Sequence, residues 1–176
     1  MDIADVVCGE NHVLALSKAG HVYSWGHNKD GRLGVDMSDG STVHVPSQVV
    51  FPGAAVKIKV AQIFCGDDAS LFIDERGQGW ACGDNRHNKL GLNDVFLTKT
   101  VPKLHVAYAQ KIRLVKGSIS YASLGPNNTC LVMSDGRVIV MGSNGHAQMS
   151  CGHVSPVDKP VWIRALMDYN IKVIHF

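Results

Sequence analysis

Nine histidines and five cysteines are the residues of this chain that could bind a metal ion or act as acids, bases or nucleophiles. Metal sites on one element need ligands at spacings such as i, i+2 or i, i+4, which place two side chains on one face. Apart from Cys151 and His153, which are two residues apart, the histidines lack such pairing with another ligand, so neither a metal site nor a catalytic histidine is expected. The histidines concerned are His21, His27, His44, His87, His105, His146 and His153.

The cysteines argue against a disulfide framework as well as a zinc site. Their number is odd, their spacings are wide and no pair follows a C-x-x-C pattern. This usage is typical of a reducing compartment, so a cytoplasmic location is expected, with a nuclear or cytoskeleton-associated one as the alternative. The five are Cys8, Cys65, Cys82, Cys130 and Cys151.

The glycine-rich stretch from Gly77 to Gly83 could suggest nucleotide binding. It reads GQGWACG, so its glycines are spaced G-x-G-x-x-x-G instead of the dinucleotide-binding G-x-G-x-x-G. The chain also lacks a phosphate-binding G-x-x-x-x-G-K-[ST] loop and the H-R-D and D-F-G motifs of protein kinases. We therefore expect no catalytic residue and no cofactor in this chain.

Charge and hydropathy argue against two further classes of partner. The formal net charge is +2 and no run of five Lys or Arg occurs, so nucleic acid is not an expected partner. The most apolar window, residues 137–142 (RVIVMG), is far too short to span a bilayer. With 45% hydrophobic and 18% charged residues, the chain is ordinary globular material.

The chain repeats itself. Residues 8–34 align without a gap with residues 65–91 at a shift of 57, and a third copy, from Leu124, is shifted by a further 59. Glycines in register across the copies are interpreted as structural, at turns and close backbone approaches. They are Gly9, Gly20, Gly26, Gly34, Gly66, Gly77, Gly83, Gly91, Gly125, Gly136 and Gly142.

Each copy is predicted to form short strands joined by tight turns. In the first copy the expected strands are residues 13–17, 21–25, 46–51 and 56–64, and residues 160–166 are an expected strand of the third copy. Leu33 is expected to plug the blade and Asn28 to cap backbone groups, while Cys8 and Cys65 are expected to be buried in inner strands. Four short strands in each repeat of 57 to 59 residues are typical of a β-propeller blade.

The pattern CGENH, followed by HVYSWGHN and GRLG, resembles the repeat of the regulator of chromosome condensation (RCC1) family. The resemblance implies an all-β fold, an RCC1-type β-propeller of which this chain holds about three of seven blades. The phrases WACGDNRHNKLGL and IDERG are most similar to the propeller of NIMA-related kinases of the Nek8/Nek9 type. The RCC1-like region is expected to fill residues 1–176, with repeats at about 3–59, 60–118 and 119–176. Residues 171–176 resemble a strand leading into a further copy, so a fragment of a larger chain is expected.

The resemblance also implies a non-catalytic module for protein–protein interaction or regulation, with partners of unknown identity that include an attached kinase domain. Loops on a rigid scaffold commonly carry binding residues. The expected contacts are His27, Lys29, Asp30 and Arg32 in the first copy, and Asp84, Arg86, His87 and Lys89 in the second. One alternative is a guanine-nucleotide exchange factor for a Ran-like small GTPase, with residues 92–100 as the candidate insertion. The other is a chromatin-associated propeller, which the low net charge disfavours.

Overall fold

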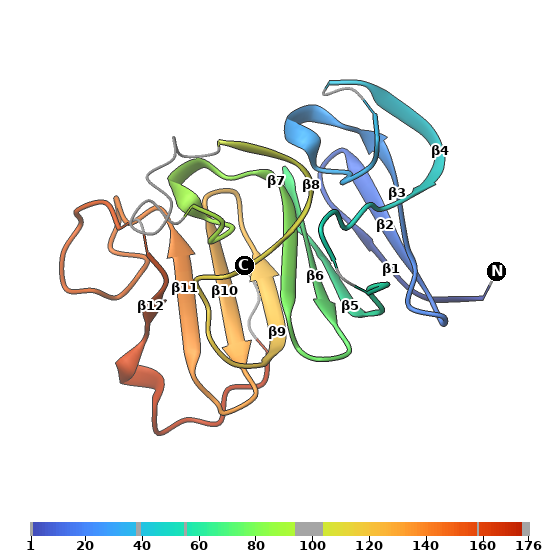
Figure 1. Ribbon diagram of the computed structural model, residues 1–176. Coiled ribbons are helices and arrows are strands. Elements are labelled where there is room, and N and C mark those ends of the chain that lie inside the picture. Colours follow the sequence, from blue (N-terminus) through green and yellow to red (C-terminus); the bar gives the residue numbers. More distant parts are fainter. Residues whose placement is uncertain (1, 38–39, 55, 94–103, 158, 174–176) are drawn as a thin grey trace.

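The computed structural model of the chain describes residues 2–37, 40–54, 56–93, 104–157 and 159–173. These residues form three four-stranded antiparallel sheets that stand side by side as the blades of a propeller (Figure 1). The expected all-β fold and the three blades of a partial propeller are therefore confirmed. No helix in the described residues is long and apolar enough to cross a membrane.

Each blade follows the chain order, so every strand pairs with its neighbour in sequence. Blade 1 contains β1 (Ile3–Cys8), β2 (His12–Ser17), β3 (Val22–His27) and β4 (Thr42–Gln48). Blade 2 contains β5 (Val60–Cys65), β6 (Ala69–Asp74), β7 (Gly79–Asp84) and β8 (His105–Lys111). Blade 3 contains β9 (Ile119–Leu124), β10 (Asn128–Met133), β11 (Val138–Gly142) and β12 (Val161–Trp162). Short 3-10 helices are η1 (Lys29–Gly31), η2 (Arg86–Asn88) and η3 (Arg164–Leu166).

Strand boundaries differ from the prediction where linkers join the blades. The strand expected at residues 46–51 is β4, which ends at Gln48, and the one expected at 56–64 starts only at Val60. The strand expected at 160–166 is wrong beyond Trp162, because Arg164–Leu166 turns into η3. Residues 171–173 are not a strand, and 174–176 lie outside the described residues, as does the expected insertion from residue 94 onward. Alternating sequence does not suffice for a strand without a neighbour to pair with.

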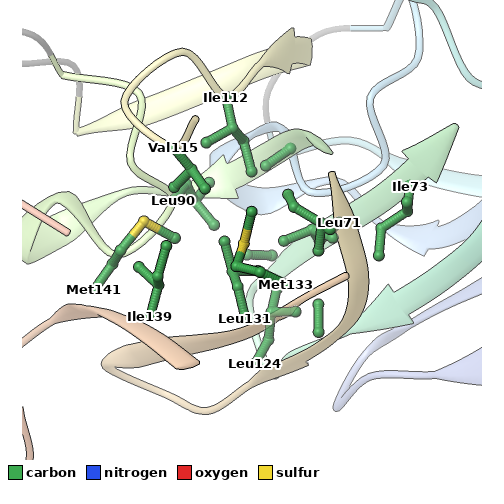
Figure 2. Close-up of a cluster of buried hydrophobic side chains, with 14 residues drawn as sticks. Leu71, Ile73, Leu90, Ile112, Val115, Leu124, Leu131, Met133, Ile139 and Met141 are labelled. Atoms are coloured by element: carbon green, nitrogen blue, oxygen red, sulfur yellow. The ribbon is translucent and has the colours of Figure 1, made fainter. Parts of the chain in front are cut away.

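Apolar side chains of blade 2 alternate between its two junctions, as the period of two in a strand requires. On β6, Leu71 and Ile73 pack toward blade 3, whereas Phe72 packs toward blade 1. Figure 2 shows the cluster between blades 2 and 3, where Leu131 and Met133 of β10 meet the blade 2 side chains. These junctions bury the apolar surface that a single sheet leaves exposed, so the blades stabilise one another.

One glycine recurs at the same position of all three blades, where the backbone of the preceding turn comes close. At Gly83 the backbone has φ of 106°, and a Cβ would lie 2.5 Å from the carbonyl oxygen of Asp68. That oxygen accepts a hydrogen bond from the Asp84 N–H at 3.0 Å, so it cannot move away. The register of β7 against β8 shifts at this point, which is where a bulge bends the outer strand. The same arrangement joins Gly26 to Asn11 and Gly142 to Asn127.

The two ends of the blades are different surfaces. We call loop end the one that carries η1, η2 and the turns between the first two strands of each blade. The linker end carries the β2–β3, β6–β7 and β10–β11 turns and the linkers between blades; its hairpin turns lie at the bottom of Figure 1. A partner that contacts the turns of several blades at once therefore lies against one of these two ends.

Cys8 corrects one prediction. It was expected to be buried, but it is exposed, because β1 lies on a face of blade 1 that is open to solvent in the described structure. Cys65 has the same position in blade 2 and is partly covered by blade 1. Its Sγ lies 3.7 Å from the carbonyl oxygen of Val7 and 3.5 Å from His12 Nε2. Burial at this repeat position thus depends on the preceding blade.

Candidate functional site

An asparagine holds the loop that follows the third strand of each blade. Asn28 Oδ1 accepts a hydrogen bond from the Leu33 N–H at 3.2 Å, and Leu33 is fully buried. Both the expected cap and the expected plug are therefore confirmed. The corresponding pairs are Asn85 with Leu90 at 2.9 Å and Asn144 with Met149 at 3.2 Å. These bonds fix the shape of η1 and η2, which carry the predicted contact residues.

A cation in each of the first two loops reaches the following blade. Arg32 Nη1 donates to the carbonyl oxygen of Asp67 at 3.0 Å, and Lys89 Nζ donates to the carbonyl oxygen of Pro126 at 2.7 Å. Arg32 is 4% exposed and Lys89 is 1% exposed. We call these two contacts the latches. Sequence reasoning missed them, although cations at one repeat position in two copies were a signal.

Asp84 is the buried anion beside the second latch. Its Oδ2 lies 2.9 Å from Lys89 Nζ and its Oδ1 lies 2.8 Å from Arg86 Nε. Burial raises the pKa of this carboxyl, but hydrogen bonds from Lys89 and Arg86 outweigh burial and hold the pKa below its ordinary value. Asp68, which pairs with both cations, adds a second carboxylate. The cluster is therefore a neutralised network that joins the loop to the blade.

The structure sorts the eight predicted contact residues by exposure. Lys29, Arg86 and His87 are exposed at the loop end, and His27 and Asp30 are partly exposed. Arg32, Asp84 and Lys89 are buried, so they are not surface residues. Arg32 and Lys89 form the latches, and Asp84 pairs with Lys89. The predicted contact surface is corrected to its exposed part, and partner binding by that part stays a prediction.

The only group of metal-ligating side chains found within ligand distance of one another in the described residues is Asp30, Asp84 and His105. His105 Nδ1 lies 2.9 Å from Asp30 Oδ1, and this pair ties η1 of blade 1 to β8 of blade 2. The Lys89 ammonium and the Arg86 guanidinium already contact both oxygens of Asp84. A divalent cation would have to displace a buried lysine, so this donor set fits a junction better than a metal.

A second polar network lies inside the junction of blades 1 and 2. His12 Nε2 is 2.9 Å from Ser70 Oγ, which donates to the carbonyl oxygen of Arg32 at 2.7 Å. Burial, with the charge of Arg32, lowers the pKa of His12 to about 4. A neutral imidazole therefore sits in the core at neutral pH. Because its partners come from two blades, the network fixes their register.

Comparison with known proteins points to one repeat family. Two models of the regulator of chromosome condensation (RCC1) repeat match residues 3–32 and 19–73. The serine/threonine-protein kinase Nek8 of Danio rerio is 33% identical over 159 residues, and Nek9 of Xenopus laevis is 33% identical over 156. These alignments cover 86% and 85% of this chain but 22% and 16% of the two kinases. The chain thus spans about a fifth of the length of these relatives.

Solved structures agree on the fold. Prp20p of Saccharomyces cerevisiae superimposes with a TM-score of 0.82 at 24% identity, over 98% of this chain and 41% of that one. Human WBSCR16 superimposes with a TM-score of 0.73 at 20% identity, over 92% of this chain and 38% of that one. The repeat matches over residues 3–73, the kinase relatives and the three blades lead to one conclusion: the chain carries RCC1 repeats and folds as part of an RCC1-type β-propeller.

Proposed function

We propose that this chain is a non-catalytic protein-interaction module that regulates a serine/threonine kinase domain attached to it or bound by it. The similarity to Nek8 and Nek9 supports the link to a kinase, because both relatives are kinases that extend well beyond the matched region. A cytoplasmic location is part of the same proposal.

The observation that carries the proposal is the rigid mounting of exposed loop residues. Lys29 and His87 are exposed, yet each sits in a loop closed by a buried asparagine on one side and a latch on the other. A loop whose backbone is held in place before binding loses little conformational entropy when a partner arrives. Such a surface suits recognition, and the partner would contact η1 and η2 together.

The test uses the endogenous product, isolated with an antibody raised against this chain. Phosphate transfer from labelled ATP to casein is measured before and after addition of the purified 176-residue chain. We expect kinase activity to co-purify, and the free chain to change its rate at least about twofold by competing for the loop-end contact. The double variant Lys29→Glu with His87→Glu should lose this effect, whereas Lys172→Glu, at another exposed site, should keep it.

Two results would overturn the proposal. One is the absence of kinase activity from the isolated product. The other is faster release of labelled GDP from a Ran-like GTPase, which would indicate an exchange factor. Prp20p is described as binding Gsp1p and histones, so these are the alternatives to include as probes.

A further inference from the structure

The linker end carries a surplus of positive charge that the net charge of the chain conceals. Its three hairpin turns and first two linkers hold six exposed cations: Lys18, Lys57, Lys59, Arg76, Arg113 and Lys116. The exposed acids in those same segments are Glu75 and Asp135, and Asp135 is paired with Arg137 at 2.7 Å. Because the whole chain has a formal charge of only +2, the linker end is a basic face on a nearly neutral molecule.

A groove opens within this basic face. It has a volume of about 340 Å³ and lies between the β2–β3 turn of blade 1 and the linker that leads to β5. Its lining is mixed: apolar side chains that include Val49, Phe51 and Ile58 lie beside the polar His21 and Gln48, with the exposed Lys57 at the rim. Phe51 packs edge-on against Phe72 and Trp80, at centroid distances of 5.5 and 5.6 Å, so one wall of the groove is anchored in the core.

One lysine lines this groove, and two more lie in the segments next to it. Lys57 lines it directly. Lys59 is adjacent, because its Cα is 3.2 Å from the position that a Cβ on the lining residue Gly20 would occupy. Lys18 belongs to the same turn as Gly20, and its side chain is 69% exposed. Its ion pair with Asp2 is 4.0 Å long and open to water, so it neutralises Lys18 weakly.

We propose that this groove binds a short acidic protein segment that inserts one apolar side chain between the lysines. The inference rests on the proposed interaction function and adds a second face and the chemistry of its partner. Carboxylates would pair with the three ammonium groups while the inserted side chain covers the apolar lining. The apolar part of the lining, with Val49, Phe51 and Ile58, offers nothing to a phosphate backbone, and a concave surface does not insert into a membrane, so both fit less well.

The test is fluorescence anisotropy with a labelled synthetic peptide in which one phenylalanine is flanked by glutamates. The 176-residue chain should bind it, and affinity should fall as salt rises. Replacing the glutamates by glutamines, or the phenylalanine by alanine, should weaken binding on the order of tenfold in each case. Lys57→Glu should weaken binding to a similar extent, and the matched variant Lys172→Glu, at an exposed lysine outside both proposed surfaces, should not.

Circular dichroism of each variant separates lost binding from lost folding. Absence of peptide binding, or equal binding by the chain and Lys57→Glu, would overturn the inference. A third contradicting result would be duplex DNA that displaces the peptide and binds the Lys57→Glu variant more weakly than the parent chain. The basic face would then be a binding site for phosphate groups. Loop-end variants that abolish the kinase effect should still bind the peptide. The two proposals can therefore fail independently, because each has its own readout.

Discussion

Arg32 and Lys89 occupy the same position of consecutive repeats, and each donates a hydrogen bond to a backbone carbonyl of the following blade. The acceptors, Asp67 and Pro126, are themselves equivalent positions. The blades are thus joined by a repeated polar contact at the loop end as well as by the apolar junctions. Arg32 and Lys89, which from the sequence were predicted to contact a partner, therefore hold neighbouring blades together.

Removing the second latch should destabilise the chain strongly. Lys89→Met keeps most of the apolar stem but leaves Asp84 buried beside one cation fewer. We expect a loss on the order of 3 kcal/mol in the free energy of unfolding, since breaking a buried pair strands its partner. Urea unfolding followed by circular dichroism measures this. Lys29→Met, at an exposed lysine, should stay within about 0.5 kcal/mol of the parent, and an equal loss in both variants would contradict the latch.

The bulge glycine should tolerate no side chain. Gly83→Ala would place a methyl group 2.5 Å from the Asp68 carbonyl oxygen at a φ of 106°. We expect a loss of about 3 kcal/mol or more in unfolding free energy, by strain and displaced backbone. Gly136→Ala is the control, because its φ is 86° but no atom lies within 4 Å of the added carbon. It should cost about 1 kcal/mol, for the left-handed backbone alone; if the two variants cost the same, crowding is not what selects glycine.

Stability should fall as the pH is lowered through the range set by His12. The unfolded chain takes up a proton near the ordinary histidine pKa of 6.5, whereas in the folded chain burial and Arg32 hold the pKa near 4. The unfolded state therefore binds more protons between these values, so this contribution is complete above about pH 6.5 and lost toward pH 4. His12→Asn, which copies Asn128 of blade 3, should show a shallower loss over this window in urea titrations. An unchanged pH slope would show that another group controls the loss.

Thiol labelling should separate the cysteines by their place in the blades. Cys8 is exposed, while Cys82 and Cys130 are buried. Burial raises the pKa of Cys130 to about 12 and raises that of Cys82 as well, so their thiolate forms are scarce at neutral pH. Cys8 should react with iodoacetamide at least about tenfold faster than either, as read by peptide mass spectrometry. Equal rates in the folded chain would mean that the junction over Cys82 and the C-terminal segment over Cys130 both open.

The positions that correspond between repeats could be predicted from the sequence, because they depend on local backbone conformation. Gly26 and Gly83 mark a bulge that excludes a side chain, and Asn28 marks a loop that needs a cap, so both leave a trace in one copy after another. Strand ends were less readable. The alternation from Val56 onward is strand-like, yet those residues run through a linker until pairing with β6 begins at Val60.

Contacts between blades could not be derived from the sequence. Arg32 and Lys89 look like solvent-exposed turn residues, and their burial depends on how the next blade is placed. The basic linker end is a similar case, because Lys57 and Arg113 are distant in sequence and share a surface only after the linkers align. Properties that arise from stacking, including the groove, needed the structure.

The latches have a consequence for how such repeats change over time. Their acceptors are main-chain carbonyls, which every residue type supplies, so the receiving position holds aspartate in one blade and proline in the next. A change of residue type at the receiving turn therefore leaves the acceptor of the latch in place. The sequences of the repeats can differ at this turn while the blades still pack in the same way. Low sequence similarity between repeats therefore does not indicate that a blade has lost its fold.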